Sequence, residues 1–286
     1  MTAVNLSFAA CGFLGIYHLG AVEAFLRHGD KLLASLRACA GTSAGALVAA
    51  VMLTAPDKVK HCKDFTYNLA TDVRQQRFGA VTPGYNVLLK LREGIEEMLP
   101  ADAHILASDR LHVSLTHFKS GKNHIVSEFK SKEDLIKRVQ CKTAHTTRRR
   151  SRRTRKIQPW RRRRRALLAS SFVPIYAGFQ PVDFQGQKWI DGGFTDSLPI
   201  LPVGRTITVS PFAGQQNVCP LHKGSEFKTQ LRLANMKINF SVENIKRLNQ
   251  ALFPPPTCRM QSLCQEGFDD AMRFLKREGW ISLRIQ

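Results

Sequence analysis

The sequence lacks several patterns that would place it in a common class of protein. Its seven cysteines are odd in number, and no two of them form a Cys-x-x-Cys pair. This spacing argues against a disulfide scaffold and a zinc ribbon, and it favours a reducing compartment. The opening residues, MTAVNLSFAA, lack the charged region and the long apolar run of a secretory signal, so we expect none.

Acidic residues are absent from one stretch, residues 138–165. Of its 28 residues, 14 are Lys or Arg, and it ends in the tract RRRSRRTRKIQPWRRRRR. The whole chain has a net charge of +21. Outside this stretch there are 29 of the 43 Lys and Arg and all 22 Asp and Glu, so the net charge of the remaining chain is only +7. An inference of nucleic-acid binding from overall charge therefore depends on this segment alone.

Residues 138–165 interrupt a predicted helix. Residues 131–134 resemble a capping box, and Leu135 begins an apolar pattern that resumes at Leu167. With 138–165 left out, Leu135 stands four positions before Leu167, which is the spacing of one helix face. We therefore predict a basic, disordered insertion within this helix.

The basic insertion has three interpretations. It could bind nucleic acid by charge, it could bind anionic lipid, or it could have no evolved role. Trp160 is its only aromatic residue, so it lacks the stacking platforms on which unpaired bases are held. We rank the third interpretation first and do not expect nucleic acid as a partner.

The first 55 residues contain the order strand, glycine turn, helix twice. Residues 4–9 (VNLSFA) lead into CGFLG and a helical pattern, and residues 36–40 (LRACA) lead into GTSAG and ALVAAVML. This order predicts an α/β fold with a mainly parallel central sheet flanked by helices. Residues 38–55 approach the length of a membrane span, but they are rich in Ala, Gly, Ser and Thr. We interpret them as a buried strand, turn and helix and predict no transmembrane helix.

Alternation and helical periodicity predict the remaining elements. Strands are expected over 111–118, 124–129 and 206–210, and a hairpin over 179–184 and 187–191. Helices are expected over 56–76, 231–253 and 266–280, with FPPP separating the last two.

Gly41-Thr42-Ser43-Ala44-Gly45 matches the Gly-x-Ser-x-Gly nucleophile elbow. A strand must turn sharply into a helix there, and the strained backbone leaves little room for flanking side chains. The following helix directs its free N–H groups and its dipole at developing negative charge. Ser43 is therefore the candidate nucleophile, and Gly41 and Gly45 are the small residues its turn requires.

A serine nucleophile needs a base, and histidine is scarce where the usual triad order would place it. After Asp191 only His222 remains, so a Ser–Asp–His triad is poorly supported. Asp191-Gly192-Gly193 offers a carboxylate instead, although Asp-Gly is also the commonest hairpin turn. Residues 9–15 (AACGFLG) could supply backbone N–H donors to an oxyanion.

Four segments together, SFAACGFLGIYHLG, AGTSAGALVA, ASSFVPIYAG and KWIDGG, resemble the patatin-like phospholipase family in residues and in order. The resemblance covers nearly the whole chain apart from 138–165. It implies a three-layer α/β fold with a mainly parallel central sheet and flanking helices. It also implies one such domain over 1–286, with 138–165 inserted into it.

The resemblance further implies a Ser–Asp dyad that works without histidine. Ser43 would be the nucleophile and Asp191 the base, with Gly192 and Gly193 in the turn that presents it. The loop around Cys11, Gly12 and Gly15 would bind the oxyanion.

This loop departs from the family pattern at two positions. Ala10 stands at a glycine of the Gly-x-Gly-x-x-Gly loop, and Leu14 replaces the basic residue of plant patatins. If position 10 needs a positive φ, Ala10 costs about 1 kcal/mol or more and distorts the oxyanion loop.

The family's activity is the hydrolysis of acyl esters such as triacylglycerols, retinyl esters or phospholipids, with transfer of the acyl group to an alcohol as a second outcome. Such substrates lie in droplets or bilayers, so we expect a cytoplasmic enzyme that is peripheral on lipid droplets or membranes. It would meet the interface through apolar side chains near the elbow.

We expect no metal and no cofactor. The alternative is a catalytically impaired hydrolase whose Arg-rich insertion binds nucleic acid or anionic lipid.

Overall fold

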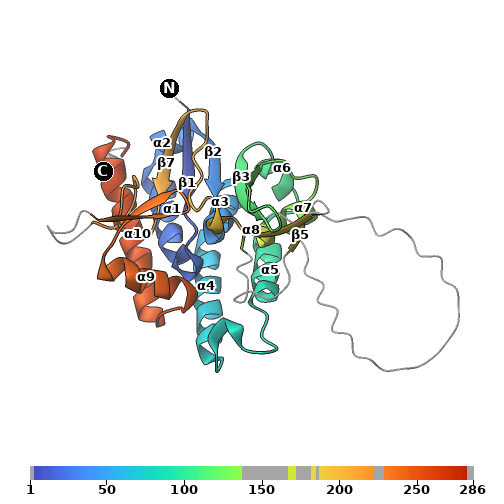
Figure 1. Ribbon diagram of the computed structural model, residues 1–286. Helices are drawn as coiled ribbons and strands as arrows, with labels where there is room; N and C mark the ends of the chain where they lie inside the picture. The colour runs from blue at the N-terminus through green and yellow to red at the C-terminus, as the bar shows by residue number, and fades with distance from the viewer. Residues whose placement is uncertain (1–2, 137–166, 172–181, 185–186, 222–228, 282–286) are drawn as a thin grey trace, which may run out of the picture.

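The computed structural model describes residues 3–136, 167–171, 182–184, 187–221 and 229–281. Within them, one mixed sheet of seven strands carries flanking helices (Figure 1). Its strand order is β5-β6-β3-β2-β1-β7, and β4 also pairs with β3. The strands are β1 (Val4–Phe8), β2 (Leu36–Gly41), β3 (Leu111–His117), β4 (Asn123–Val126), β5 (Val182–Phe184), β6 (Gln187–Asp191) and β7 (Arg205–Val209).

The centre of the sheet is parallel and its β3 side is antiparallel. β1 pairs in parallel with both β2 and β7, and β2 pairs in parallel with β3. β4 and β6 run antiparallel to β3, and β5 runs antiparallel to β6. The predicted α/β fold with a mainly parallel sheet is confirmed, and the predicted hairpin is present in its described residues, with the rest of 179–186 outside them.

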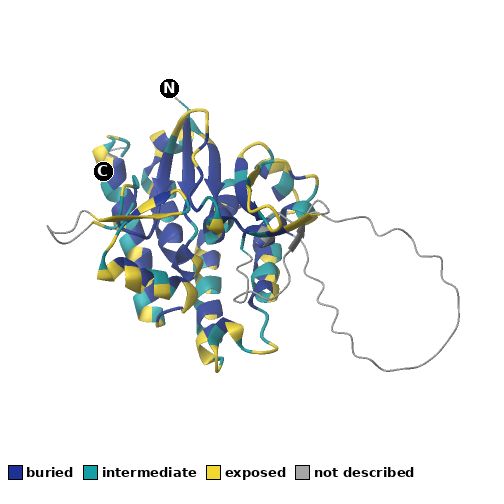
Figure 2. Cartoon of the chain, in the orientation of Figure 1, coloured by how far each residue is buried: buried dark blue, intermediate teal, exposed yellow. Residues whose placement is uncertain are grey.

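Small residues let the N-terminal elements pack closely. All of β1 is buried, and β2 leads through a short turn into α3 (Ala44–Thr54), whose residues are nearly all buried. Residues 38–55 therefore form the end of a strand, a turn and a helix within the core, as predicted (Figure 2). In the part of the chain that the structure describes, no helix has the length and apolar character needed to cross a membrane.

The longest helix, α10 (Thr257–Arg277), packs along α1 (Gly15–His28). A Cβ on Gly20 would collide with the Cys264 carbonyl, and one on Gly267 would collide with the Tyr17 carbonyl. The two backbones therefore approach each other where each helix has a glycine. Further helices include α2 (Asp30–Ser35), α4 (Val59–Gln75), α5 (Val87–Met98), α6 (Ala103–Ala107) and the short 3-10 helices η1 (Gly12–Leu14), η2 (Pro56–Lys58), η3 (Gly79–Val81) and η4 (Gly192–Phe194).

The helix predicted over 231–253 is wrong in its first half. A two-stranded hairpin of β8 (Gln230–Leu233) and β9 (Met236–Asn239) comes first, and α9 (Val242–Leu252) follows. The connecting residues Ala234 and Asn235 both have positive φ, at 41° and 69°, which suits the tight two-residue hairpin turn. The turn contains no glycine, so the sequence carries a weak signal for it.

Two short helices border the basic insertion. α7 (Lys132–Ile136) precedes it and α8 (Leu167–Ser170) follows it, and the two helices contact each other. Leu135 and Leu167 are both fully buried. The insertion predicted at 138–165 lies outside the described residues, and so does most of the segment ASSFVPIYAG, so both stay predictions.

Candidate active site

Ser43 occupies a strained turn between β2 and α3. Its φ of 55° and ψ of −129° lie in a region that residues with a side chain rarely adopt. A Cβ on Gly41 would meet the backbone of Gly45 and Ala46, and a Cβ on Gly45 would collide with the carbonyl of Phe8. The turn is therefore possible only with glycine on both sides of the serine.

Hydrogen bonds to its backbone hold Ser43 in this conformation. Its N–H donates to Ser170 Oγ at 2.9 Å, and that hydroxyl donates to the Ser114 carbonyl at 2.8 Å. Its own carbonyl accepts from the amide of Ala46 at 3.0 Å. None of these bonds uses the Ser43 side chain, which faces the pocket described below. Ser170 lies in α8, so the chain directly after the insertion supports the elbow.

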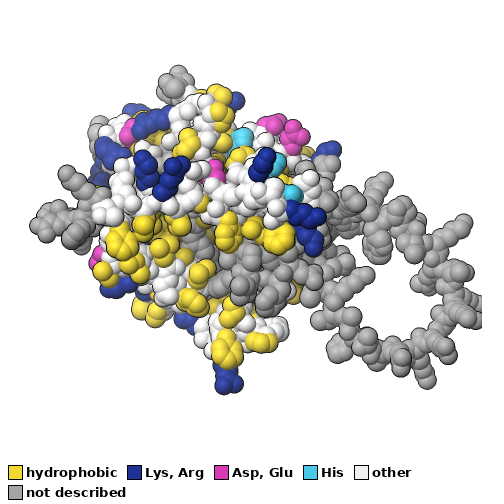
Figure 3. All heavy atoms as spheres, viewed as in Figure 1, with side chains coloured by type: hydrophobic (Ala, Val, Ile, Leu, Met, Phe, Trp, Pro, Cys, Tyr) yellow, Lys and Arg dark blue, Asp and Glu magenta, His cyan; other side chains and the backbone are white. Residues whose placement is uncertain are grey.

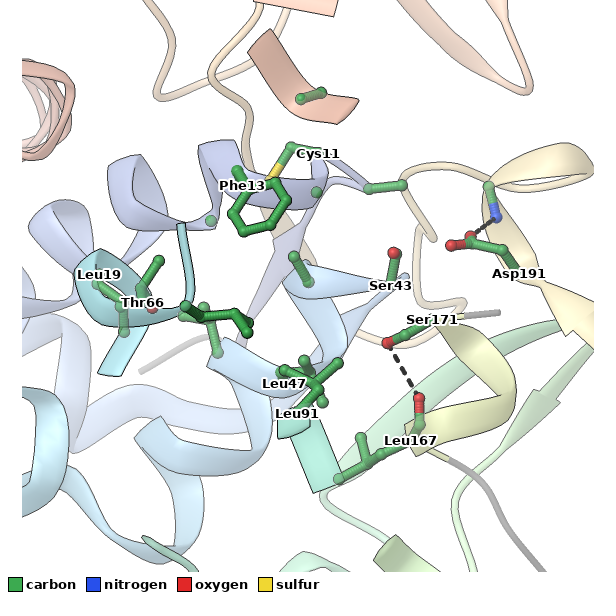
Figure 4. Close-up of a pocket in the computed structure, with 18 of the residues that line it drawn as sticks. Cys11, Phe13, Leu19, Ser43, Leu47, Thr66, Leu91, Leu167, Ser171 and Asp191 are labelled. Atoms are coloured by element: carbon green, nitrogen blue, oxygen red, sulfur yellow. Dashed lines mark hydrogen bonds between the residues drawn. The ribbon is translucent and has the colours of Figure 1, made fainter. Parts of the chain in front are cut away.

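Asp191 is the last residue of β6, and its side chain is buried. Its Oδ1 accepts from the amide of Gly193 at 2.7 Å, and its carbonyl accepts from Thr116 Oγ1 at 2.9 Å. Burial raises the pKa of Asp191 to about 6, and hydrogen bonds from the Ser43 side chain and the Gly193 amide act in the opposite direction. Figure 4 shows the Asp191 carboxylate pointing toward Ser43.

Hydrogen bonds connect the turn after Asp191 to β3 and to the turn that holds Ser43. Thr42 Oγ1 donates to the carbonyl of Asp196 at 2.9 Å, and Ser114 Oγ donates to the same carbonyl at 3.0 Å. A Cβ on Gly192 would collide with the Ser114 carbonyl, and one on Gly193 would lie 2.9 Å from Asp191 Oδ1. The two glycines therefore let the carboxylate sit against β3 and accept its amide hydrogen bond.

The glycine-rich loop after β1 turns at Gly12. Gly12 has a φ of 53°, and a Cβ there would collide with the carbonyl of Ala251 in α9. Ala10 is not among the residues with positive φ, so the strain considered for Ala10 does not arise. The residue of this loop that must be glycine is Gly12, two positions after Ala10.

The amides of this loop differ in their partners. The Gly15 amide donates to the carbonyls of Gly12 and Phe13. Among the described residues, the amides of Cys11 and Gly12 have no acceptor, and both residues line the pocket. Burial, with the nearby Asp191 carboxylate, raises the pKa of the Cys11 thiol well above its usual range, so this thiol stays protonated.

Ala44 is a further candidate donor, which was not predicted from the sequence. It is the first residue of α3 and lines the pocket beside Ser43, and its amide has no acceptor in the described part of the chain. The signal was present, because the residue after a nucleophile-elbow serine commonly donates its N–H to the oxyanion.

One pocket of about 500 Å³ joins these groups. Ser43, Asp191, Cys11, Gly12, Gly15 and Gly193 all line it, whereas Gly41, Gly45 and Gly192 lie behind it in the turns. Apolar side chains from α1, α3, α4 and α5 form most of the remaining wall (Figure 4), among them Leu19, Leu47, Val51, Phe65, Leu91 and Ile95. No Lys, Arg or His is present in its described lining. The helices α4 and α5 were not recognised from the sequence as part of the site.

The buried histidine nearest in sequence to the loop has a structural role. His18 Nε2 lies 3.0 Å from the carbonyl of Ala9, and burial lowers the pKa of His18 to about 4, so the ring is neutral. His222 lies outside the described residues. Within the described ranges, no three His, Cys, Asp or Glu side chains are placed together to hold a metal ion.

Comparison with known proteins adds to this geometry. The model of the family described as "Patatin-like phospholipase" matches residues 6–203. The chain is 52% identical over 281 residues to human "Patatin-like phospholipase domain-containing protein 4", covering 98% of the chain and 100% of that relative. It is 34% identical over 275 residues to mouse "1-acylglycerol-3-phosphate O-acyltransferase Pnpla3", covering 96% of the chain and 59% of that relative. Among solved structures, VipD from Legionella pneumophila matches with 10% identity and a TM-score of 0.45, over 96% of the chain and 67% of VipD.

Proposed function

This chain belongs to the patatin-like phospholipase family, and from that membership we propose that it is a serine acyl hydrolase that cleaves lipid esters through an acyl-Ser43 intermediate. The observation that carries the proposal is the convergence of Ser43 and Asp191 in one apolar pocket. A buried carboxylate with a pKa of about 6 is ionised near neutral pH and is still basic enough to accept a proton.

In the first step, Ser43 Oγ attacks the carbonyl carbon of the ester, and its hydroxyl proton passes to the Asp191 carboxylate. The tetrahedral intermediate then collapses. The ester C–O bond breaks, and the leaving alcohol takes the proton from Asp191. The acyl group remains on Ser43, and Asp191 is again a carboxylate.

The developing oxyanion needs hydrogen-bond donors that are fixed in place beforehand. We assign this role to the loop of Cys11, Gly12 and Gly15, and add the amide of Ala44. The amides of Cys11, Gly12 and Ala44 are the better placed donors, because the Gly15 amide donates within its own turn. Each fixed donor in such a site contributes roughly a hundredfold or more to the rate.

The acyl-Ser43 intermediate is released by water or by an alcohol. Water gives hydrolysis, with its proton passing to Asp191 and then back to Ser43. An acyl-acceptor alcohol gives transfer, which agrees with the acyltransferase name of the mouse relative. The two outcomes differ only in the acceptor, so both belong to the same proposed site.

The pocket favours neutral esters over phospholipids. Its described lining contains one carboxylate, Asp191, and no Lys or Arg to balance a phosphate. A volume of about 500 Å³ with mostly apolar walls lies in the usual range for a small-molecule site and suits an acyl chain. We therefore place triacylglycerols and retinyl esters ahead of phospholipids as substrates, met at the surface of a droplet or membrane.

The test is esterase activity on a soluble short-chain ester and on emulsified triolein. Ser43→Ala should reduce both to background, and a fluorophosphonate probe should label Ser43 in the parent and nothing in the variant. Ser262→Ala, a serine on the surface of α10, should behave as the parent. Retention of activity or of labelling by Ser43→Ala would refute the assignment. The alternative role of the Arg-rich insertion depends on residues 138–165, which lie outside the described residues, and stays a prediction.

A further inference from the structure

Large apolar side chains are exposed on and beside α9. We call this group of residues the α9 surface. It comprises Phe194, Leu231, Leu233, Phe240, Val242, Ile245, Leu252 and Phe253, all of them at least one-third exposed. Figure 3 shows hydrophobic side chains gathered over the region of the β8–β9 hairpin and α9.

α9 buries two of its polar residues and exposes two of its apolar residues. Val242 and Ile245 are 61% and 50% exposed, whereas Asn244 and Arg247 are buried. The two buried polar residues have partners. Asn244 hydrogen-bonds the Ala213 backbone, and Arg247 donates to the Pro211 carbonyl at 2.9 Å and to Glu266 at 2.6 Å.

Val242, Ile245 and Leu252 recur at helical spacing and form a stripe on the outward side of α9, in which exposed Asn249 stands between the last two. Soluble helices normally turn such a stripe toward the core, and contiguous exposed apolar patches mark interaction sites. The inward face of α9 consists of Asn244, Arg247, Leu248 and Ala251, with Ala251 against Gly12. Among the described residues, Val242 and Ile245 therefore stay at least half exposed.

The α9 surface is continuous with the mouth of the pocket. Phe194, Leu233 and Leu252 are exposed and also line the pocket that holds Ser43. An apolar molecule on this surface can therefore pass along these three side chains into the pocket. This continuity points to a lipid surface, because the same layer that contacts the stripe would contain the substrate.

The charges around the stripe favour a phospholipid surface. Arg232, Lys237 and Lys246 are exposed on β8, β9 and α9, and Glu243 is the only acidic residue between 229 and 253. Basic residues beside an exposed apolar helix face are typical of helices that lie in the headgroup region. Each such charge adds roughly a factor of five in affinity for an anionic membrane.

We propose that the α9 surface docks the protein onto a phospholipid membrane surface, with Val242 and Ile245 inserted among the lipids and the pocket mouth facing them. The inference rests on the proposed lipid-ester function of the same pocket. α9 also carries the Ala251 carbonyl that contacts Gly12, so the docked helix lies directly against the oxyanion loop.

The test is co-flotation of the full chain with vesicles of phosphatidylcholine, alone and with one-fifth phosphatidylserine. The double variant Val242→Gln, Ile245→Gln should bind both vesicle types about tenfold or more weakly than the parent, because two inserted apolar side chains are lost. The control is Ile105→Gln, Ile200→Gln, whose side chains are 68% and 65% exposed outside the α9 surface. It should bind within about twofold of the parent. All variants keep residues 138–165, so any binding by the Arg-rich tract is common to them.

Hydrolysis separates this inference from the proposed function. The α9 double variant should hydrolyse a soluble short-chain ester as the parent does, because neither residue lines the pocket. On phosphatidylcholine-coated triolein, its activity should fall in proportion to its loss of binding. Equal flotation of the double variant and the parent would overturn the docking inference, as would an equal loss in the control. Binding is measured in the Ser43→Ala background as well, where flotation should equal that of the parent. A Ser43→Ala protein that floats and keeps its activity on the soluble ester would contradict the catalytic proposal alone.

Discussion

Replacing Asp191 with Asn should make the protein more stable at neutral pH while removing its proposed base. Asp191 is 3% exposed, and burial raises its pKa from 3.8 to about 6. Keeping this carboxylate ionised in the folded state therefore costs about 3 kcal/mol, at about 1.4 kcal/mol per pKa unit. Asn has the same shape, and its Oδ1 can still accept the hydrogen bond from the Gly193 amide.

The pH dependence follows from the direction of the shift. Below pH 3.8 the carboxyl is protonated in both the folded and the unfolded chain, so it makes no difference to stability. As the pH rises toward about 6, the unfolded chain releases the proton first, and the parent loses stability relative to the variant. Above about pH 6 the carboxyl is ionised in both the folded and the unfolded parent, and the difference in the free energy of unfolding between parent and variant stays constant.

The assay is urea unfolding of the parent and Asp191→Asn from pH 4.5 to 8. Other titrating groups are shared and cancel in the difference. We expect the advantage of the variant to grow by about 1 to 3 kcal/mol up to about pH 6 and then to level off. Esterase activity of the variant should fall by about a thousandfold or more. An advantage that is independent of pH, or a variant less stable than the parent at pH 7, would show that Asp191 is not a buried carboxylate with a raised pKa.

Four further predictions test the site. Esterase activity on a soluble ester should rise about tenfold per pH unit below pH 6 and level off above it, because Asp191 must be ionised to act; a profile without a bend near pH 6 contradicts this. Ser43→Gly should be more stable in urea than Ser43→Ala by about 1 kcal/mol, since glycine adopts the φ of 55° without strain; the reverse order would argue against a strained elbow. Gly12→Ala should lower the free energy of unfolding by about 2 kcal/mol and the esterase rate by about a hundredfold, because the new Cβ collides with the Ala251 carbonyl. Ala10→Gly should change the free energy of unfolding by less than about 1 kcal/mol and leave the esterase rate within about twofold of the parent. A large gain in activity would indicate that Ala10 strains the loop after all.

The strand–turn–helix units were predictable because their signals are local. In residues 4–55, apolar runs, glycine turns and helical periodicity each occur within about a dozen residues. Ser43 could be predicted as the candidate nucleophile for the same reason, since Gly41 and Gly45 lie close to it and are required by steric contacts of the turn itself. Local propensity and tertiary packing agree here, as they do in most well-folded segments.

The prediction over 231–241 failed where local signals are ambiguous. Leu231 and Leu233 alternate with polar residues as in a strand, but apolar residues are dense enough nearby to fit a helix as well. The turn uses Ala234 and Asn235 in the left-handed region, where the usual sequence signal is glycine. Only the packing of Met236 and Ile238 into the core selects the hairpin.

The approach of Asp191 to Ser43 could not be worked out from sequence pattern alone. The two residues are 148 positions apart, and the resemblance to a family, rather than any spacing, paired them. Their meeting depends on the antiparallel pairing of β6 with β3, in which Leu115 faces Asp191, and on the bonds from Thr42 and Ser114 to Asp196. Such long-range contacts leave no periodic signal in the chain.

The sequence by itself determined the sharp turn at Ser43, the proposed nucleophile, and the alternation of strands and helices around it, because steric and hydrophobic preferences act over a few residues. The tertiary structure alone decided three things. It buried Asp191 and so raised its pKa, it placed the positive φ of the loop at Gly12 rather than at position 10, and it left the apolar stripe of α9 facing outward. Each of these depends on which distant surfaces pack together and which remain in contact with solvent.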